Sequence, residues 1–125
     1  MPAFVVVGVG ASAGGLEAYA QLLRAIPPDI GMVFVLVQHM APQHDSILPE
    51  LLRESTEIPV VQATEGTTMT ANRVYVAPPN AQVAIIDGKL HLVPQPEERG
   101  GFLPIDFFFR SLAEYAQGRA VGIVL

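Results

Sequence analysis

Two side chains that could carry out covalent chemistry, the hydroxyl of Ser12 and the imidazole of His39, each follow an apolar run of the sequence. Ser12 lies in "GVGASAGG", where Gly10 and Gly14 frame it at the spacing of a nucleophile elbow. A serine hydroxyl is a poor nucleophile near neutral pH unless a base stands within hydrogen-bonding distance, and imidazole is a suitable base. Backbone amides near Ala13 could stabilise an oxyanion at the start of the following helix. The residues therefore predict a serine nucleophile with a histidine base.

The glycines around Ser12 allow a second interpretation, a loop that cradles phosphate. Gly8 and Gly10 resemble the first half of a dinucleotide-binding fingerprint, and Ala13 is permitted at its third glycine position. After the next apolar run, however, His39 and its neighbours stand where an acidic residue should bind the ribose, and the Gly-Lys-Ser/Thr of a Walker loop is missing from the sequence. Two structural explanations stay open as well, since Ser12 could cap a helix and His39 could be a hydrogen-bonded surface residue.

Hydrophobic patterning predicts the elements that must position these side chains. Continuous apolar runs are typical of parallel strands covered on both faces, and helices show apolar residues at helical spacing. The expected strands cover 4–7, 32–37, 58–61 and 120–125, and the expected helices cover 16–26, 46–52 and 105–116. Glycines are expected to end the first strand after Val7, and Asp87-Gly88 predicts an inserted β-hairpin between the runs 83–86 and 90–93. The order of these elements predicts an α/β fold with a doubly wound, mostly parallel, Rossmann-like three-layer sheet.

The functional groups of a doubly wound sheet lie just beyond the carboxyl ends of its strands. Ser12 follows the first expected strand and His39 follows the second, so we expect both at one edge of the sheet. The loop after the last expected strand would share that edge, and it would follow Leu125. We therefore expect residues 1–125 to be one incomplete domain.

Other polar and aromatic residues have simpler explanations. His44 lies in an expected loop and His91 on the expected hairpin, and both are interpreted as solvated or structural. Asp106 is interpreted as a first-turn carboxylate that the helix dipole favours. The aromatic run Phe107–Phe109 is interpreted as core packing, with one of the three rings off the core face.

The composition excludes several classes of function. The chain has 125 residues, seven Lys and Arg against twelve Asp and Glu, and a net charge of −5, so a broad cationic surface for nucleic acid is not expected. With no cysteine, thiolate nucleophiles, disulfides and zinc–cysteine sites are excluded. No apolar run is long enough to span a bilayer, and the first residues lack the features of a secretory signal. We expect a cytoplasmic domain that does not bind membranes.

Five segments, in order and at similar intervals, carry a family resemblance: "GVGASAGGLEAYAQLL", "VFVLVQHM", "NRVYVAPPNAQVAI", "LPIDFFFRSLAE" and "AVGIVL". They resemble the catalytic domain of the chemotaxis protein-glutamate methylesterases of the CheB type, over essentially the whole chain. The segments "APPN" and "LPIDFFFRSLAE" are similar to the corresponding segments of methylesterase domains that are fused to a receptor methyltransferase.

The resemblance implies a function and a role for each site residue. It implies hydrolysis of glutamate γ-methyl esters on chemoreceptors, with deamidation of receptor glutamines as a related activity, and it calls for no metal or organic cofactor. Ser12 matches the nucleophile and His39 the general base, while Ala13 stands where the family frequently has threonine. The implied partner is the cytoplasmic domain of a methylated chemoreceptor, with a receiver or methyltransferase domain as a possible neighbour in a longer protein. A non-catalytic regulatory or scaffolding domain and a nucleotide-binding module are the alternatives.

The resemblance also places the third member of the triad, an aspartate, in a glycine-rich loop after Leu125. Loss of the triad carboxylate lowers turnover by about 10⁴-fold. We therefore expect the 125-residue chain to be weakly active or inactive. An uncovered apolar surface beside the strand 120–125 would also favour self-association.

Overall fold

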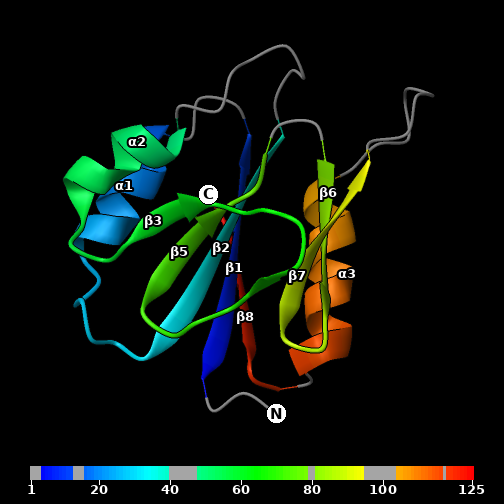
Figure 1. Cartoon of the computed structure of the whole chain (residues 1–125). Helices are drawn as coiled ribbons and strands as arrows, with labels where there is room; N and C mark the ends of the chain where they lie inside the picture. Colours follow the sequence, from blue (N-terminus) through cyan, green and yellow to red (C-terminus); the bar gives the residue numbers. More distant parts are fainter. Residues whose placement is uncertain (1–3, 13–15, 40–47, 79–80, 95–103, 117) are drawn as a thin grey trace.

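The computed structural model describes residues 4–12, 16–39, 48–78, 81–94, 104–116 and 118–125. Within these residues, five strands form a central sheet in the order β3-β5-β2-β1-β8, and every neighbouring pair is parallel. Their bounds are β1 Val5–Ser12, β2 Met32–His39, β3 Val60–Gln62, β5 Arg73–Val76 and β8 Ala120–Val124. From β1 the chain first adds β2 on one side and later β8 on the other, so the strand order reverses at β1 (Figure 1).

The sheet is covered on both faces, as its continuous apolar strands require. Figure 1 shows α1 (Leu16–Arg24) and α2 (Leu48–Leu52) on one face, and α3 (Pro104–Ala116) with the hairpin β6–β7 on the other. A short 3₁₀ helix, η1 (Arg53–Ser55), continues α2. This arrangement confirms the predicted α/β fold with a mostly parallel sheet.

Two apolar cores lie on the two faces of the sheet. The core beneath α1 and α2 includes Val7, Val9 and Ala11 of β1, and the core beneath α3 includes Val6. The alternation along β1 therefore points odd-numbered residues toward α1 and even-numbered residues toward α3. Phe108 and Leu112 are buried in the second core, so α3 packs with the apolar face that the sequence predicts.

The first strand extends farther than its sequence predicts. β1 runs to Ser12, so Gly8 and Gly10 lie within the strand and do not end it at Val7. A Cβ at Gly8 would lie 2.8 Å from Phe108 Cε2, and a Cβ at Gly10 would lie 2.6 Å from Ile105 Cγ2. These glycines therefore let α3 approach the sheet closely, and their role is in packing.

The predicted hairpin is present and belongs to a second sheet. In the described residues this sheet is antiparallel, with the order β4-β7-β6: β4 is Thr67–Thr68, β6 is Ala81–Ile86 and β7 is Lys89–Pro94. Asp87 and Gly88 have φ values of 54° and 77°, as a two-residue type I′ turn requires. The short strand β4 was not predicted, because Thr67 and Thr68 lie in a polar segment.

Element ends differ slightly from the predictions. α1 ends at Arg24, and the next two amides bond three residues back, Ala25 N to Leu22 O at 3.1 Å and Ile26 N to Leu23 O at 3.2 Å. Such bonds tighten the last turn of a helix. α2 begins at Leu48, and the earlier part of the helix predicted from residue 46 lies outside the described residues.

Candidate active site

Ser12 and His39 are the last residues of two neighbouring strands in the middle of the sheet. β1 and β2 pair in register from Val5↔Met32 to Ser12↔His39, so the two candidate residues are direct register partners. Neighbouring strands lie about 4.8 Å apart. The structure thus brings the two positions together at the carboxyl edge of the sheet, the edge that carries functional groups in doubly wound folds (Figure 1).

The strands that carry these residues are held on both sides almost to their ends. On one side of β1, Leu125 N donates to Gly10 O at 2.8 Å. On the far side of β2, Ala77 N donates to Leu36 O at 2.9 Å. Both bonds extend the strand pairing to within two or three residues of the candidate pair. A scaffold of this kind suits a site whose groups must keep a fixed separation.

A buried hydrogen bond also ties α1 to the end of β2. The Tyr19 hydroxyl donates to Val37 O at 3.0 Å, and the Tyr19 side chain is completely buried. Burial raises the pKa of the Tyr19 phenol, so it stays a protonated donor at neutral pH. Tyr19 lies within the helix expected over 16–26, but the sequence carries no signal for this bond, because its acceptor is a backbone carbonyl 18 residues away.

The remaining predicted site residues lie outside what the structure describes. Ala13, the predicted oxyanion residue, is in the segment between β1 and α1 that is not described, and so is Gly14. His44 is also outside the described residues. The aspartate implied by the family resemblance would follow Leu125.

The glycines of the phosphate-loop alternative are covered by protein. Side chains of α3 lie over Gly8 and Gly10, where pyrophosphate would have to approach the backbone. The dinucleotide fingerprint uses its second glycine to allow that approach. The packing of α3 thus disfavours a nucleotide site on this face of β1.

His91 has a structural partner, in agreement with its interpretation from sequence. Its Nδ1 lies 2.8 Å from Glu65 Oε2, and Leu92 N donates to the other carboxylate oxygen of Glu65 at 2.7 Å. These bonds lower the pKa of Glu65, the backbone amide contributing more than the imidazole. The pair joins the loop before β4 to β7. Asp106 lies in the first turn of α3, where it was expected.

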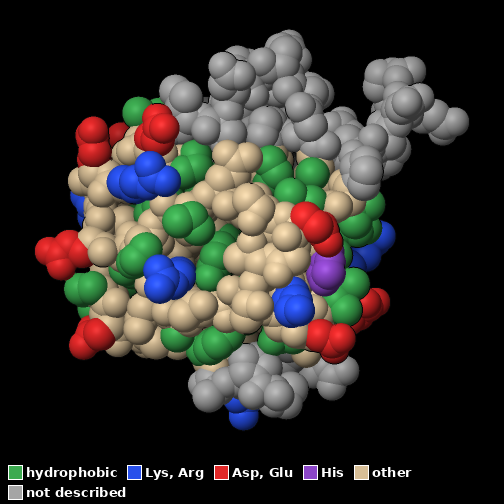
Figure 2. Space-filling model, in the orientation of Figure 1, with side chains coloured by type: hydrophobic (Ala, Val, Ile, Leu, Met, Phe, Trp, Pro, Cys, Tyr) green, Lys and Arg blue, Asp and Glu red, His purple; other side chains and the backbone are tan. Residues whose placement is uncertain are grey.

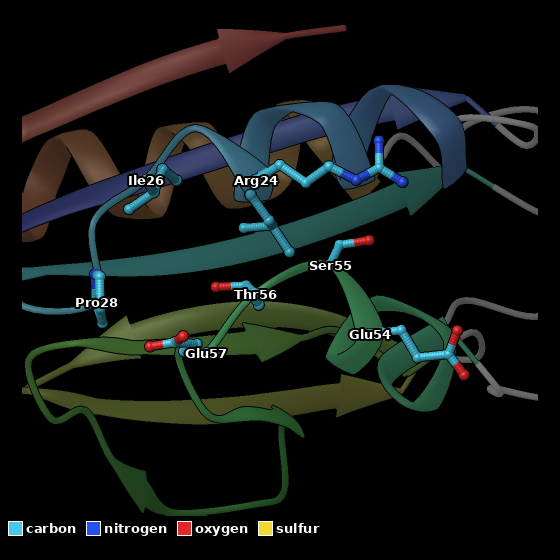
Figure 3. A pocket seen from close by; sticks show the side chains of 8 residues that line it. Arg24, Ile26, Pro28, Glu54, Ser55, Thr56 and Glu57 are labelled. Carbon is cyan, nitrogen blue, oxygen red and sulfur yellow. The ribbon is translucent and has the colours of Figure 1, made fainter.

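A surface pocket of about 410 Å³ lies between the end of α1 on one side and η1 with the two residues after it on the other. Figure 3 shows that its polar side chains diverge: Thr56 and Glu57 point to one side, whereas Ser55 and Glu54 point to the other. Arg24 extends along α1 and lies 3.7 Å from Glu17 in an exposed ion pair. Ligand sites need polar groups that converge. This pocket therefore does not compete with the edge of the sheet as the candidate site.

Charged side chains of both signs are spread over the surface drawn in Figure 2. On the face in Figure 2, Lys and Arg side chains are interspersed with Asp and Glu, and they do not gather into one patch. None of the helices in the described part of the chain is long and apolar enough to cross a membrane. Among the same residues, no three His, Cys, Asp or Glu side chains form a group that could hold a metal ion.

A parallel α/β sheet with a serine and a histidine at the ends of adjacent strands defines the general class of this molecule, an α/β domain with a candidate hydrolytic site. A family model described as CheB methylesterase matches residues 7–125. The chain belongs to the CheB methylesterase family.

Named relatives and a solved structure agree with this assignment. The chain is 36% identical over 120 residues to protein-glutamate methylesterase/protein-glutamine glutaminase 1 of Bordetella avium and 32% identical over 124 residues to the protein-glutamate methylesterase/protein-glutamine glutaminase of Trichodesmium erythraeum. These alignments cover 95% and 96% of the chain but 35% of each relative, so the chain spans about a third of their length. The crystal structure of the Thermotoga maritima CheB methylesterase catalytic domain has the same fold, with a TM-score of 0.83 and 23% identity over 98% of this chain and 67% of that one.

Proposed function

We propose that this chain is part of a protein-glutamate methylesterase in which Ser12 is the nucleophile and His39 the general base. The observation that carries the proposal is the register pairing of Ser12 with His39 at the carboxyl ends of two central strands. Relatives named protein-glutamate methylesterase/protein-glutamine glutaminase support the same reaction class.

The proposed reaction has two steps, formation of a glutamyl–serine ester and its hydrolysis. His39 accepts the Ser12 proton as the oxygen attacks the γ-carbonyl carbon of a glutamate methyl ester, and the protonated imidazole then delivers that proton to the departing methoxide, so methanol leaves. Water, deprotonated by His39, next cleaves the glutamyl–serine ester and regenerates glutamate and the serine hydroxyl. With glutamine as substrate the same sequence releases ammonia. The Ala13 amide is the proposed oxyanion donor.

The proposed substrate is the methylated cytoplasmic domain of a chemoreceptor, which sets the site of action in the cytoplasm. An aspartate from sequence after Leu125 is the proposed third residue, and it would orient the imidazole and stabilise its charged form. A receiver or a methyltransferase domain is the proposed neighbour in a longer protein. Without that aspartate, we expect the 125-residue chain to be about 10⁴-fold slower than a complete enzyme.

The test is methanol release from a methylated receptor fragment. It uses a protein in which residues 1–125 continue into the sequence with the proposed aspartate, and the 125-residue chain in parallel. Ser12→Ala is expected to reduce the rate by at least about 10⁴-fold. Ser55→Ala is the matched control, because Ser55, at the end of η1, lines the surface pocket and its substitution should leave the rate unchanged.

Two results would overturn the proposal. Equal rates for the parent protein and Ser12→Ala would remove Ser12 from the mechanism. A parent protein that binds the receptor but releases no methanol would favour the alternative of a regulatory or scaffolding domain.

A further inference from the structure

The Tyr19 hydroxyl lies at a particular place relative to the two proposed catalytic positions. Its acceptor, Val37 O, is 3.0 Å away and belongs to the residue two positions before His39. The register partner of Val37 is Gly10, two positions before Ser12. The bond therefore joins β2 two residues before His39, next to the residue of β1 that lies two positions before Ser12.

The other end of this bond lies close to Ser12 along the chain. α1 begins at Leu16, four residues after Ser12, and Tyr19 is in the first turn of α1. α1, the first described element after Ser12, is therefore tied through Tyr19 to the strand that carries His39. We propose that Tyr19 is a positioning residue, which fixes the spacing between the chain at Ser12 and the chain at His39; this inference rests on the proposed function.

A directional bond matters here because the core packing between the described residues of α1 and the sheet is apolar. Tyr19, Ala20 and Leu23 pack in the core with Val9 and Leu36. Apolar contacts are non-directional. A hydrogen bond sets both distance and direction. Reactive groups displaced by about 1 Å can lose about 100-fold in rate.

Tyr75 provides a matched control. It is also buried, and its hydroxyl accepts from Thr70 N at 3.0 Å and donates to Thr68 O at 3.4 Å. Thr68 is the last residue of β4 in the second sheet, and Thr70 follows two residues later. Tyr75→Phe removes the same hydroxyl as Tyr19→Phe and keeps the ring, but it leaves the bond at the end of β2 in place.

The kinetic test measures kcat and KM for methanol release from a methylated receptor fragment. It uses the protein in which residues 1–125 continue into the sequence with the proposed aspartate. We expect Tyr19→Phe to lower kcat by about 10-fold to 100-fold with KM within about twofold of the parent value, since the substrate still binds while the reacting groups are misplaced. Tyr75→Phe is expected to leave both constants within about twofold. Urea unfolding of each variant verifies that the assays use folded protein.

Unchanged kcat in Tyr19→Phe, or equal losses in both variants, would overturn the inference, because the bond would then contribute to stability alone. A second measurement needs no enzymatic activity. Amide chemical shifts and hydrogen exchange of Gln38 and His39 in the 125-residue chain should change in Tyr19→Phe and stay unchanged in Tyr75→Phe, and unchanged values in Tyr19→Phe would also overturn it. Failure of the proposed function is distinguishable, since it gives equal methanol release with and without Ser12.

Discussion

Ile105 of α3 lies directly over Gly10 of β1. A Cβ at position 10 would be 2.6 Å from Ile105 Cγ2 and 3.2 Å from its Cδ1. Real Cβ atoms do not approach other atoms within 3.0 Å, so α3 can lie this close to the strand only because position 10 has no side chain. The start of α3 is thus packed two residues from Ser12.

Gly10→Ala is expected to lower the free energy of unfolding by about 1–3 kcal/mol, because the added methyl group overpacks the contact with Ile105. Gly122→Ala is the control, since its Cβ would lie 3.4 Å from Phe109 Cε2, and it should change stability by less than about 0.5 kcal/mol. Urea unfolding followed by circular dichroism measures both. Adding Ile105→Ala to Gly10→Ala should recover part of the loss, and a fully additive double variant would contradict the contact.

Tyr115→Phe is expected to leave stability unchanged or to raise it by up to about 1 kcal/mol. Its hydroxyl oxygen is buried without a hydrogen-bond partner among the described residues, so removing it deletes an unsatisfied polar group. Desolvation, and next the charge of Asp87, raises the pKa of this phenol. Tyr75→Phe, which loses two bonds, should cost about 1 kcal/mol in the same urea titration. Equal losses in the two variants would show that the Tyr115 hydroxyl has a partner.

Glu65→Gln is expected to lower the urea midpoint at neutral pH and to have little effect in acid. The Leu92 amide and then His91 lower the pKa of Glu65 in the folded chain. A carboxylate whose folded pKa is depressed stabilises the fold above its unfolded pKa, and this stabilisation disappears as the pH falls through the folded pKa. Urea midpoints measured from neutral to strongly acidic pH test this.

Glu57→Gln makes the same change of charge at an exposed position and serves as the control for Glu65→Gln. Its effect on the midpoint should be small throughout the titration. A difference between Glu65→Gln and the parent chain that persists at the acid limit would mean that the carboxylate contributes through something other than its charge.

The 125-residue chain is expected to self-associate through β8. Val121, Val124 and Leu125 are 45%, 72% and 43% exposed. Among the described residues, β8 forms one edge of the sheet, and its sequence holds no charged residue or proline. Such an edge strand pairs readily with another chain. Val121→Lys should shift sedimentation velocity profiles toward monomer, while Ile86→Lys, which adds the same charge at an exposed site on the hairpin, should not. Concentration-independent monomer in the parent chain would refute this.

Local patterns in the sequence were sufficient for most elements. The run of apolar residues in β2 and the helical spacing of α1 and α3 each predict their own structure, because burial on one face or two is recorded in consecutive residues. Asp87-Gly88 predicts its turn for a similar reason, since few residue pairs accept positive φ at both positions. That Ser12 and His39 would share one edge of the sheet was also expected from such patterns, although both strands extend beyond their expected ends to include these residues.

Contacts between distant segments decided the rest. In the sequence alone, Gly8 and Gly10 indicate the end of a strand. Their role in packing is evident only from the structure, where α3, almost a hundred residues later, lies against them. The sequence marks Tyr19 only as part of a helix and Glu65 only as a loop carboxylate. Their hydrogen bonds to Val37 O and from Leu92 N exist because the tertiary structure places β2 beside Tyr19 and β7 beside Glu65. That Ser12 pairs with His39, and with no residue before or after it, depends on the register of β1 and β2. A sequence records which side chains seek burial, but register and helix depth depend on how surfaces far apart in the chain fit together, so only the tertiary structure decides them.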